Sequence, residues 1–207
     1  MSFYRRHLPH WQPNQAEFFI TFRLAGSLPR KAIERLKRHR TQLEDQNDPE
    51  AKIRIQKEIF QKYEQLLNGA EIGPTWLRQN EIASIVVDSI HFYDESKYDL
   101  YAYCVMPNHV HLVFRFLDQT DNSDEKYRVT KILHSIKSYT ALECNKVLER
   151  SGPFWQPESY DRVIRDQDEL ENIIRYTLNN PVKAGFVERW RAWPHSYCKP
   201  EFVETFM

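Results

Sequence analysis

The sequence predicts an α+β domain in which helices pack on an antiparallel, ferredoxin-like sheet. The order of periodic segments is β-α-β-β-α-β-α, which is typical of that layered architecture. Only Pro107-Asn108 separates two apolar strand segments, and so short a connection favours a tight hairpin. A length of 207 residues suits one domain that carries an insertion, and we predict a single catalytic domain over residues 1–207.

The first strand and the insertion follow each other at the start of the chain. Residues 17–24 alternate, which puts four apolar side chains on one face: Phe18, Ile20, Phe22 and Leu24. Helical periodicity runs from Pro29 to about Leu43 and begins again after Asp48-Pro49, continuing to Gly69. We therefore predict an inserted helical hairpin at about 29–73, polar on its outer side.

The central part of the chain reads as a helix followed by two strands. The helix carries Ala83, Val86, Val87 and Ile90 at helical spacing. Residues 98–106 are apolar on both faces, with Leu100, Ala102 and Cys104 alternating against Tyr101, Tyr103 and Val105. This predicts a central strand covered on both sides, paired through the hairpin with a strand over 109–116.

The last part of the chain predicts a helix, a strand and a second helix. The first helix has an apolar stripe made of Ile132, Leu133, Ile136, Tyr139, Leu142 and Val147. A strand is expected near residues 160–165. The final helix begins at about Gln167 and buries one stripe formed by Leu170, Ile173, Ile174 and Thr177.

Two histidines at the start of the predicted 109–116 strand form the first candidate site. His109 and His111 are two residues apart, so they project from one face of the strand while Val110, Leu112 and Phe114 project from the other. This geometry suits a metal site made of two imidazoles, although a pair of hydrogen-bonded polar residues would produce the same spacing.

Tyr176 and Asn180 form the second candidate site. They are four residues apart and hence neighbours on one helical face, and Pro181 places Asn180 near the end of that helix. Tyr176 falls at the edge of the buried stripe, where its hydroxyl can reach outward. Tyr139 is the rival nucleophile, but its place on an apolar stripe favours the core.

Composition excludes several classes of function. The 29 basic and 29 acidic side chains balance, so bulk charge does not indicate a polyanionic partner. The three cysteines lie far apart, which argues against disulfides and zinc ribbons, and no glycine pattern suits a nucleotide-binding loop. The lack of a long apolar stretch and of a signal-peptide core favours a cytoplasmic protein without a membrane span.

Three segments together resemble the REP-associated tyrosine transposases, single-tyrosine enzymes named for a His-hydrophobic-His motif. The segments are Val105 to Val113, Phe154 to Arg165 and Ile174 to Gly185, and they occur in the order expected for that family. The inserted helices and the neutral charge depart from the family pattern.

This resemblance implies a set of roles for the candidate residues. His109, His111 and Asn180 would be ligands of a divalent cation, Mg²⁺ or Mn²⁺, and Tyr176 would be the nucleophile on DNA. The product would be a 5′-phosphotyrosine with a free 3′-hydroxyl, so rejoining would need no ATP. A replication-initiator nuclease of the same motif class would share this chemistry, but such nucleases usually adjoin a helicase.

The substrate that the resemblance implies is single-stranded DNA with a REP-like hairpin, bound by a monomer or a homodimer. Candidate DNA contacts are the basic and aromatic side chains beside the motifs, namely Arg115, Trp155, Arg162, Arg165 and Lys183. A different class of function remains open, a domesticated protein that binds DNA or RNA hairpins without cleaving them.

Overall fold

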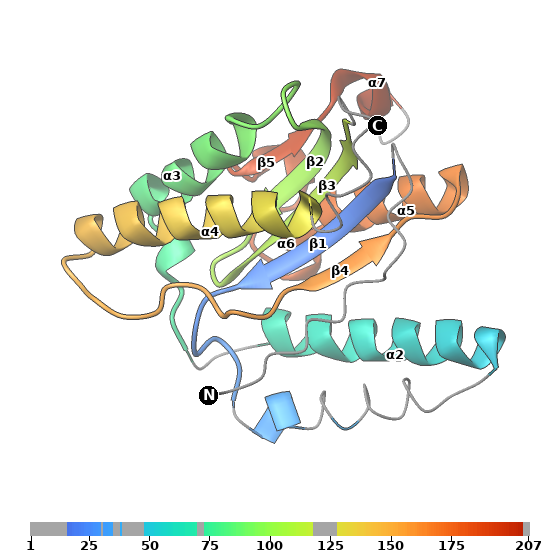
Figure 1. Cartoon of the computed structure of the whole chain (residues 1–207), viewed down its shortest axis with the longest axis horizontal. Helices are drawn as coiled ribbons and strands as arrows, with labels where there is room; N and C mark the ends of the chain where they lie inside the picture. The colour runs from blue at the N-terminus through green and yellow to red at the C-terminus, as the bar shows by residue number, and fades with distance from the viewer. Residues whose placement is uncertain are drawn as a thin grey trace.

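A five-stranded antiparallel sheet forms the centre of the computed structural model, which describes residues 16–29, 31–34, 38, 48–69, 73–117 and 128–204. The strands are β1 (Glu17–Arg23), β2 (Tyr98–Val105), β3 (His109–Phe116), β4 (Tyr160–Val163) and β5 (Ser196–Cys198). Their spatial order is β4-β1-β3-β2-β5 (Figure 1). The predicted α+β class with an antiparallel sheet is confirmed.

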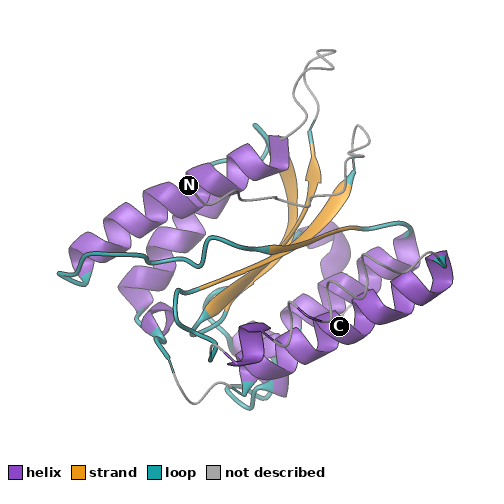
Figure 2. Cartoon of the chain, turned by 60° about the horizontal axis from the view of Figure 1, so that its bottom comes forward, coloured by secondary structure: helices purple, strands orange, loops and turns teal. Residues whose placement is uncertain are grey.

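Helices cover both faces of this sheet (Figure 2). One face packs against α3 (Asn80–His91) and α4 (Arg128–Val147), and the other packs against α5 (Gln167–Leu178) and part of α2 (Pro49–Asn68). Shorter helical turns connect the rest: η1 (Trp76–Arg78), α6 (Asn180–Lys183), η2 (Trp190–Ala192) and α7 (Pro200–Val203). None of the helices in the described ranges is both long enough and apolar enough to cross a membrane.

The alternation of strand residues divides the interior into two hydrophobic clusters. Phe18 of β1 and Phe114 of β3 are paired in register and point into the cluster beneath α3 and α4. Their neighbours Phe19 and Val113 point into the other cluster, beneath α5. Because paired residues share a face, Thr21 lies beside His111 on the α5 side of the sheet.

The regular alternation expected for β2 is interrupted by a bulge. The pairing with β3 shifts between Leu100 and Ala102, and consequently Tyr101 and Ala102 both belong to the α5-side cluster. Tyr103 and Val105 then face α3 and α4 together with Leu100. The inserted residue makes a contact of its own, since the Tyr101 carbonyl accepts a hydrogen bond from the Lys199 amide at 2.8 Å.

The buried stripe of α4 differs from the predicted one. Ile132 and Ile136 are buried as expected, but Tyr139 and Leu142 are 56% and 57% exposed. Thr140 and Cys144 take the inner positions instead, because the Thr140 hydroxyl is satisfied by the Ile136 carbonyl at 2.7 Å. The expectation that Tyr139 lies in the core is therefore wrong, and its helix covers the face opposite the histidines.

The insertion between β1 and α3 is only partly described. Residues 31–34 are helical, but most of the first helix of the predicted hairpin lies outside the described residues, so the hairpin itself stays a prediction. The second helix, α2, packs against the sheet. Phe60 lies against Phe19 of β1, and the Asn108 side chain donates a hydrogen bond to the Leu67 carbonyl at 3.0 Å.

Candidate metal centre and nucleophile

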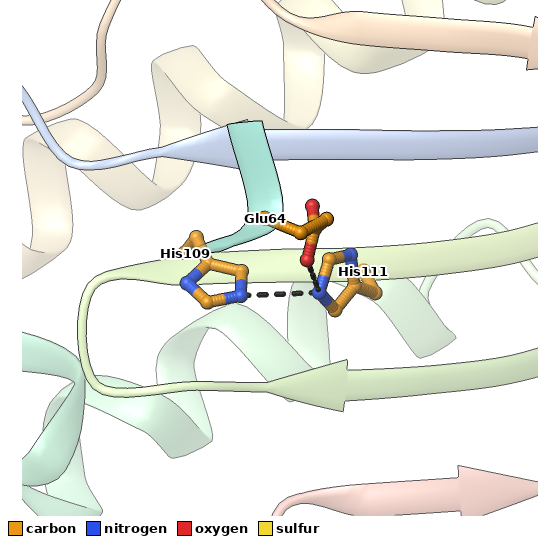
Figure 3. A group of neighbouring side chains, drawn as sticks. All are labelled: Glu64, His109 and His111. Carbon is orange, nitrogen blue, oxygen red and sulfur yellow. Dashed lines mark hydrogen bonds and ion pairs between the residues drawn. The ribbon is translucent and has the colours of Figure 1, made fainter. Parts of the chain in front are cut away.

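His109 and His111 lie side by side at the start of β3, and both are fully buried. Their Nε2 atoms are 3.1 Å apart (Figure 3). Two nitrogen ligands at right angles on an ion, each about 2.1 Å from it, would lie about 3.0 Å apart. The observed separation therefore suits shared coordination.

Hydrogen bonds on the outer side of each ring decide which nitrogen carries the proton. The Asn108 oxygen Oδ1 lies 2.6 Å from Nδ1 of His109, and because Asn108 Nδ2 already donates to Leu67, that oxygen can only accept. His111 Nδ1 lies 2.9 Å from the Thr21 hydroxyl, and the Asn180 amide donates to His111 Nε2 at 2.9 Å. Both Nε2 atoms therefore present lone pairs, as metal ligands do.

Glu64 completes the cluster from α2. This side chain is 5% exposed, and its Oε2 lies 3.2 Å from His111 Nε2 (Figure 3). Glu64, His109 and His111 can each offer a ligand atom, with these atoms all within 4.8 Å of one another. The structure thus brings together the predicted histidines and a carboxylate that lies more than 40 residues away in the chain.

Tyr176 and Asn180 meet this cluster from the end of α5 and the start of α6, and their side chains are neighbours as the spacing predicted. The Tyr176 hydroxyl donates a hydrogen bond to Glu64 Oε2 and accepts one from Asn180 Nδ2 at 3.2 Å. Its ring lies edge-on to His111, with centroids 5.6 Å apart. Pro181 follows directly, and α5 ends at Leu178, so Asn180 opens the next turn.

The electrostatics of the cluster favour an ionised Glu64 carboxylate and a neutral His109 ring. Burial opposes ionisation of Glu64, but the neighbouring His111, together with His109 and the hydrogen bond from Tyr176, outweighs burial and lowers the pKa of this carboxyl. Burial, assisted by His111, lowers the pKa of His109. Burial and the negative charge of Glu64 raise the pKa of Tyr176, so the phenol keeps its proton in this arrangement.

Two further oxygens indicate that the cluster suits a cation. Glu64 Oε1 and Asn180 Oδ1 are both buried, and neither has a hydrogen-bond partner within the described part of the chain. The residues that contact one another here therefore combine two lone-pair nitrogens, from His109 and His111, with the carboxylate of Glu64 and the amide oxygen of Asn180. Such a set of acceptors fits a divalent cation with mixed nitrogen and oxygen ligands.

The five candidate DNA contacts fall in different places. Arg162 and Arg165 line a cleft beside Tyr176, and the Lys183 ammonium lies 4.8 Å from the centre of the Tyr176 ring. Arg115 pairs with Asp99 at 3.0 Å at the far end of β3. Trp155 is 6% exposed among the residues beneath α4, and its indole donates to Thr140 at 2.8 Å, so this ring is not accessible for stacking on a base.

Sequence reasoning missed Glu64, Thr21 and Asn108. The one usable signal for Glu64 was its position within an apolar stripe of α2, four residues after Phe60 and three before Leu67. A carboxylate on the inward face of a helix requires a partner. Thr21 and Asn108 gave no such signal, because their roles depend on strand register and on the turn.

Comparisons with known proteins agree with this geometry. A family model described as "Transposase IS200 like" matches residues 78–180. A Haemophilus influenzae protein named as a REP-associated tyrosine transposase is 30% identical over 104 residues, which cover 48% of this chain and 58% of that protein. For the REP-associated tyrosine transposase of Escherichia coli the identity is 26% over 99 residues, 48% of this chain and 53% of the relative.

The chain thus spans somewhat more than half the length of these two relatives. A solved structure of a REP-associated tyrosine transposase bound to a REP hairpin is similar over 95% of this chain and 82% of that one, with a TM-score of 0.52 and 17% identity. That likeness concerns the fold. Together with the histidine pair and the tyrosine that faces it, these matches assign the chain to the family of IS200-like transposases, whose curated relatives here are named REP-associated tyrosine transposases.

Proposed function

We propose that this chain cleaves and rejoins single-stranded DNA that carries a REP-like hairpin, through a covalent bond between Tyr176 and DNA. The observation that carries the proposal is the position of one oxygen, Glu64 Oε2. This oxygen contacts both the hydroxyl of the candidate nucleophile Tyr176 and the ring of the candidate ligand His111. The related structure in complex with a REP hairpin supports the choice of DNA.

His109, His111 and Glu64 would hold the cation, and the amide oxygen of Asn180 is a fourth available donor. Mn²⁺ or Mg²⁺ suits a site that must also bind phosphate oxygens and water, and two imidazoles favour Mn²⁺. When bound, the ion neutralises charge on the scissile phosphate and orients that group for in-line attack.

Tyr176 then supplies the new bond. Its phenolic oxygen attacks phosphorus, the bond from phosphorus to the 3′-oxygen breaks, and the 3′-oxygen takes a proton from water to leave as a hydroxyl. The phenol loses its own proton in this step, and Glu64 Oε2 already accepts that proton in a hydrogen bond. The 5′-phosphotyrosine keeps the energy of the phosphodiester, so the reverse reaction with another 3′-hydroxyl rejoins the strand.

A gel assay tests this proposal. End-labelled hairpin oligonucleotides with single-stranded flanks are incubated with protein and Mn²⁺ or Mg²⁺ and resolved under denaturing conditions. We expect a protein-DNA adduct that EDTA and Tyr176→Phe abolish. Tyr139→Phe is the matched control, because Tyr139 is exposed on the helix that covers the opposite face of the sheet. An adduct that persists in Tyr176→Phe contradicts the assignment.

The non-cleaving binder makes the opposite prediction in the same assay. Tight hairpin binding by the wild-type chain, without an adduct under any metal condition, would favour that function. The hydrogen bond from Tyr176 to Glu64 would then serve only to hold α2 against α5.

A further inference from the structure

A cleft of about 370 Å³ opens beside the candidate nucleophile. Tyr176 forms one end, and Asn172, Glu169 and Asp166 follow along one face of α5 towards its N-terminus. Ten residues of helix separate Tyr176 from Asp166, a length of about 15 Å. A DNA strand whose phosphate lies at Tyr176 therefore passes the cleft or enters it.

The inner wall of the cleft is aromatic. The rings of Phe60 and Tyr160 lie 5.0 Å apart, and Phe60 also contacts Phe19 and Tyr176 at 5.4 Å each. Phe60 comes from α2 and Tyr160 from β4, so the insertion and the sheet build this wall together. Such a surface suits the flat face of a nucleobase, because stacking on aromatic rings requires no particular base sequence.

Two polar atoms on residues of the same wall have no partner. The Tyr160 hydroxyl and Arg162 Nε are buried and form no hydrogen bond with any described residue. Buried polar groups of this kind are normally satisfied, so each one calls for an explanation. A planar ligand with donors and acceptors on its edge would satisfy both atoms.

The carboxylates at the cleft are already engaged by the protein. Glu169 forms an ion pair with Arg162 and accepts a hydrogen bond from the Arg165 amide at 2.9 Å, and Asp166 caps α5 by accepting from the Glu169 amide at 2.8 Å. The Arg165 side chain is exposed at the rim. The rim therefore offers a cation to a phosphate group outside the aromatic wall.

We infer that this cleft binds one unpaired nucleotide of the DNA strand next to the scissile phosphate, with its base stacked on the Phe60 ring. The edge of that base faces the Tyr160 hydroxyl and Arg162, and its phosphate lies towards Arg165. A phosphate alone would not require the aromatic wall, and a purely apolar ligand would leave both polar atoms unsatisfied. This inference rests on the proposed function, because it needs DNA at Tyr176.

An abasic scan tests the cleft without relying on cleavage. The probe is a DNA hairpin with single-stranded 5′ and 3′ extensions, in which one base at a time is removed from the extensions. Binding is measured with Tyr176→Phe protein, so that no covalent bond forms. We expect one position at which loss of the base weakens binding by about 5- to 150-fold, the range typical of a single stacked base.

Variants of the wall then assign that position to the cleft. Phe60→Leu keeps an apolar side chain but removes the ring, and we expect it to abolish most of the dependence on the base at that position. Tyr160→Phe keeps the ring and removes only the hydroxyl, and we expect a loss of about 2- to 12-fold there. Phe92→Leu is the matched control, because Phe92 is 75% exposed and lies outside the cleft.

The outcomes separate this inference from the proposed function. If no position depends on its base, or if Phe60→Leu and Tyr160→Phe leave the dependence intact, the cleft inference is overturned even where the wild-type chain forms an adduct. If the dependence on one base appears as expected but the wild-type chain forms no adduct, the cleft inference is supported and the proposed cleavage function is overturned. If no oligonucleotide binds at all, both are overturned.

Discussion

At the scale of single residues, Glu64 Oε2 joins the two parts of the site, since it contacts both His111 and Tyr176. His109, His111, Tyr176 and Asn180 could be predicted because each pair lies within one short stretch of chain. Two residues along a strand or four along a helix share a face whatever the rest of the fold does. Glu64 could not be predicted in this way, because its position depends on how α2 packs on the sheet.

A substitution at Glu64 tests its part in cation binding. Glu64→Gln replaces a carboxylate by an amide of similar shape, so we expect the affinity for Mn²⁺ to fall at least about tenfold in isothermal titration calorimetry. Glu58→Gln is the matched control, because Glu58 lies on the same helix and is exposed. Unchanged Mn²⁺ affinity in Glu64→Gln would exclude Glu64 and would leave Asn180 as the third ligand.

At the scale of elements, hydrophobic periodicity located the helices and strands better than it located their buried faces. The presence of α3, the start of α5 at Gln167 and the hairpin between β2 and β3 agree with the sequence. On α4, however, apolar residues occur on more than one face, and the hydrogen bond of Thr140 let a polar residue take an inner position. The bulge in β2 likewise follows from no local pattern, and its Tyr101 carbonyl pairs with the distant Lys199 amide.

The observed face of α4 predicts opposite effects for two apolar truncations. Ile136 is fully buried, so Ile136→Ala is expected to lower the free energy of unfolding by about 2–5 kcal/mol in urea denaturation. Leu142 is 57% exposed, so Leu142→Ala on the same helix is expected to change it by less than about 0.5 kcal/mol. A large loss at Leu142 would show that this helix packs by the stripe that the sequence suggested.

At the scale of the whole molecule, one face of the sheet is covered by an apolar core, and the other face also carries the candidate site. The face under α3 and α4 holds a large apolar cluster, whereas the face under α5 and α2 holds the histidines, Glu64 and Tyr176 as well as a smaller cluster. The order β4-β1-β3-β2 follows from the predicted β-α-β-β-α-β succession, but β5 is added at the edge by the C-terminal part of the chain. No local sequence pattern predicted β5, which is only three residues long.

The central claim is that Tyr176 forms a covalent bond with DNA beside a cation held by His109 and His111. The most direct measurement is mass spectrometry of the adduct formed with a hairpin oligonucleotide and Mn²⁺, after digestion with nuclease and trypsin. Trypsin cleaves after Arg175 and Lys183, so it releases Tyr176 on a peptide of its own. We predict a nucleotide joined through its 5′-phosphate to Tyr176 in this peptide, and its absence from His109→Ala protein. A nucleotide on any other residue would contradict the account.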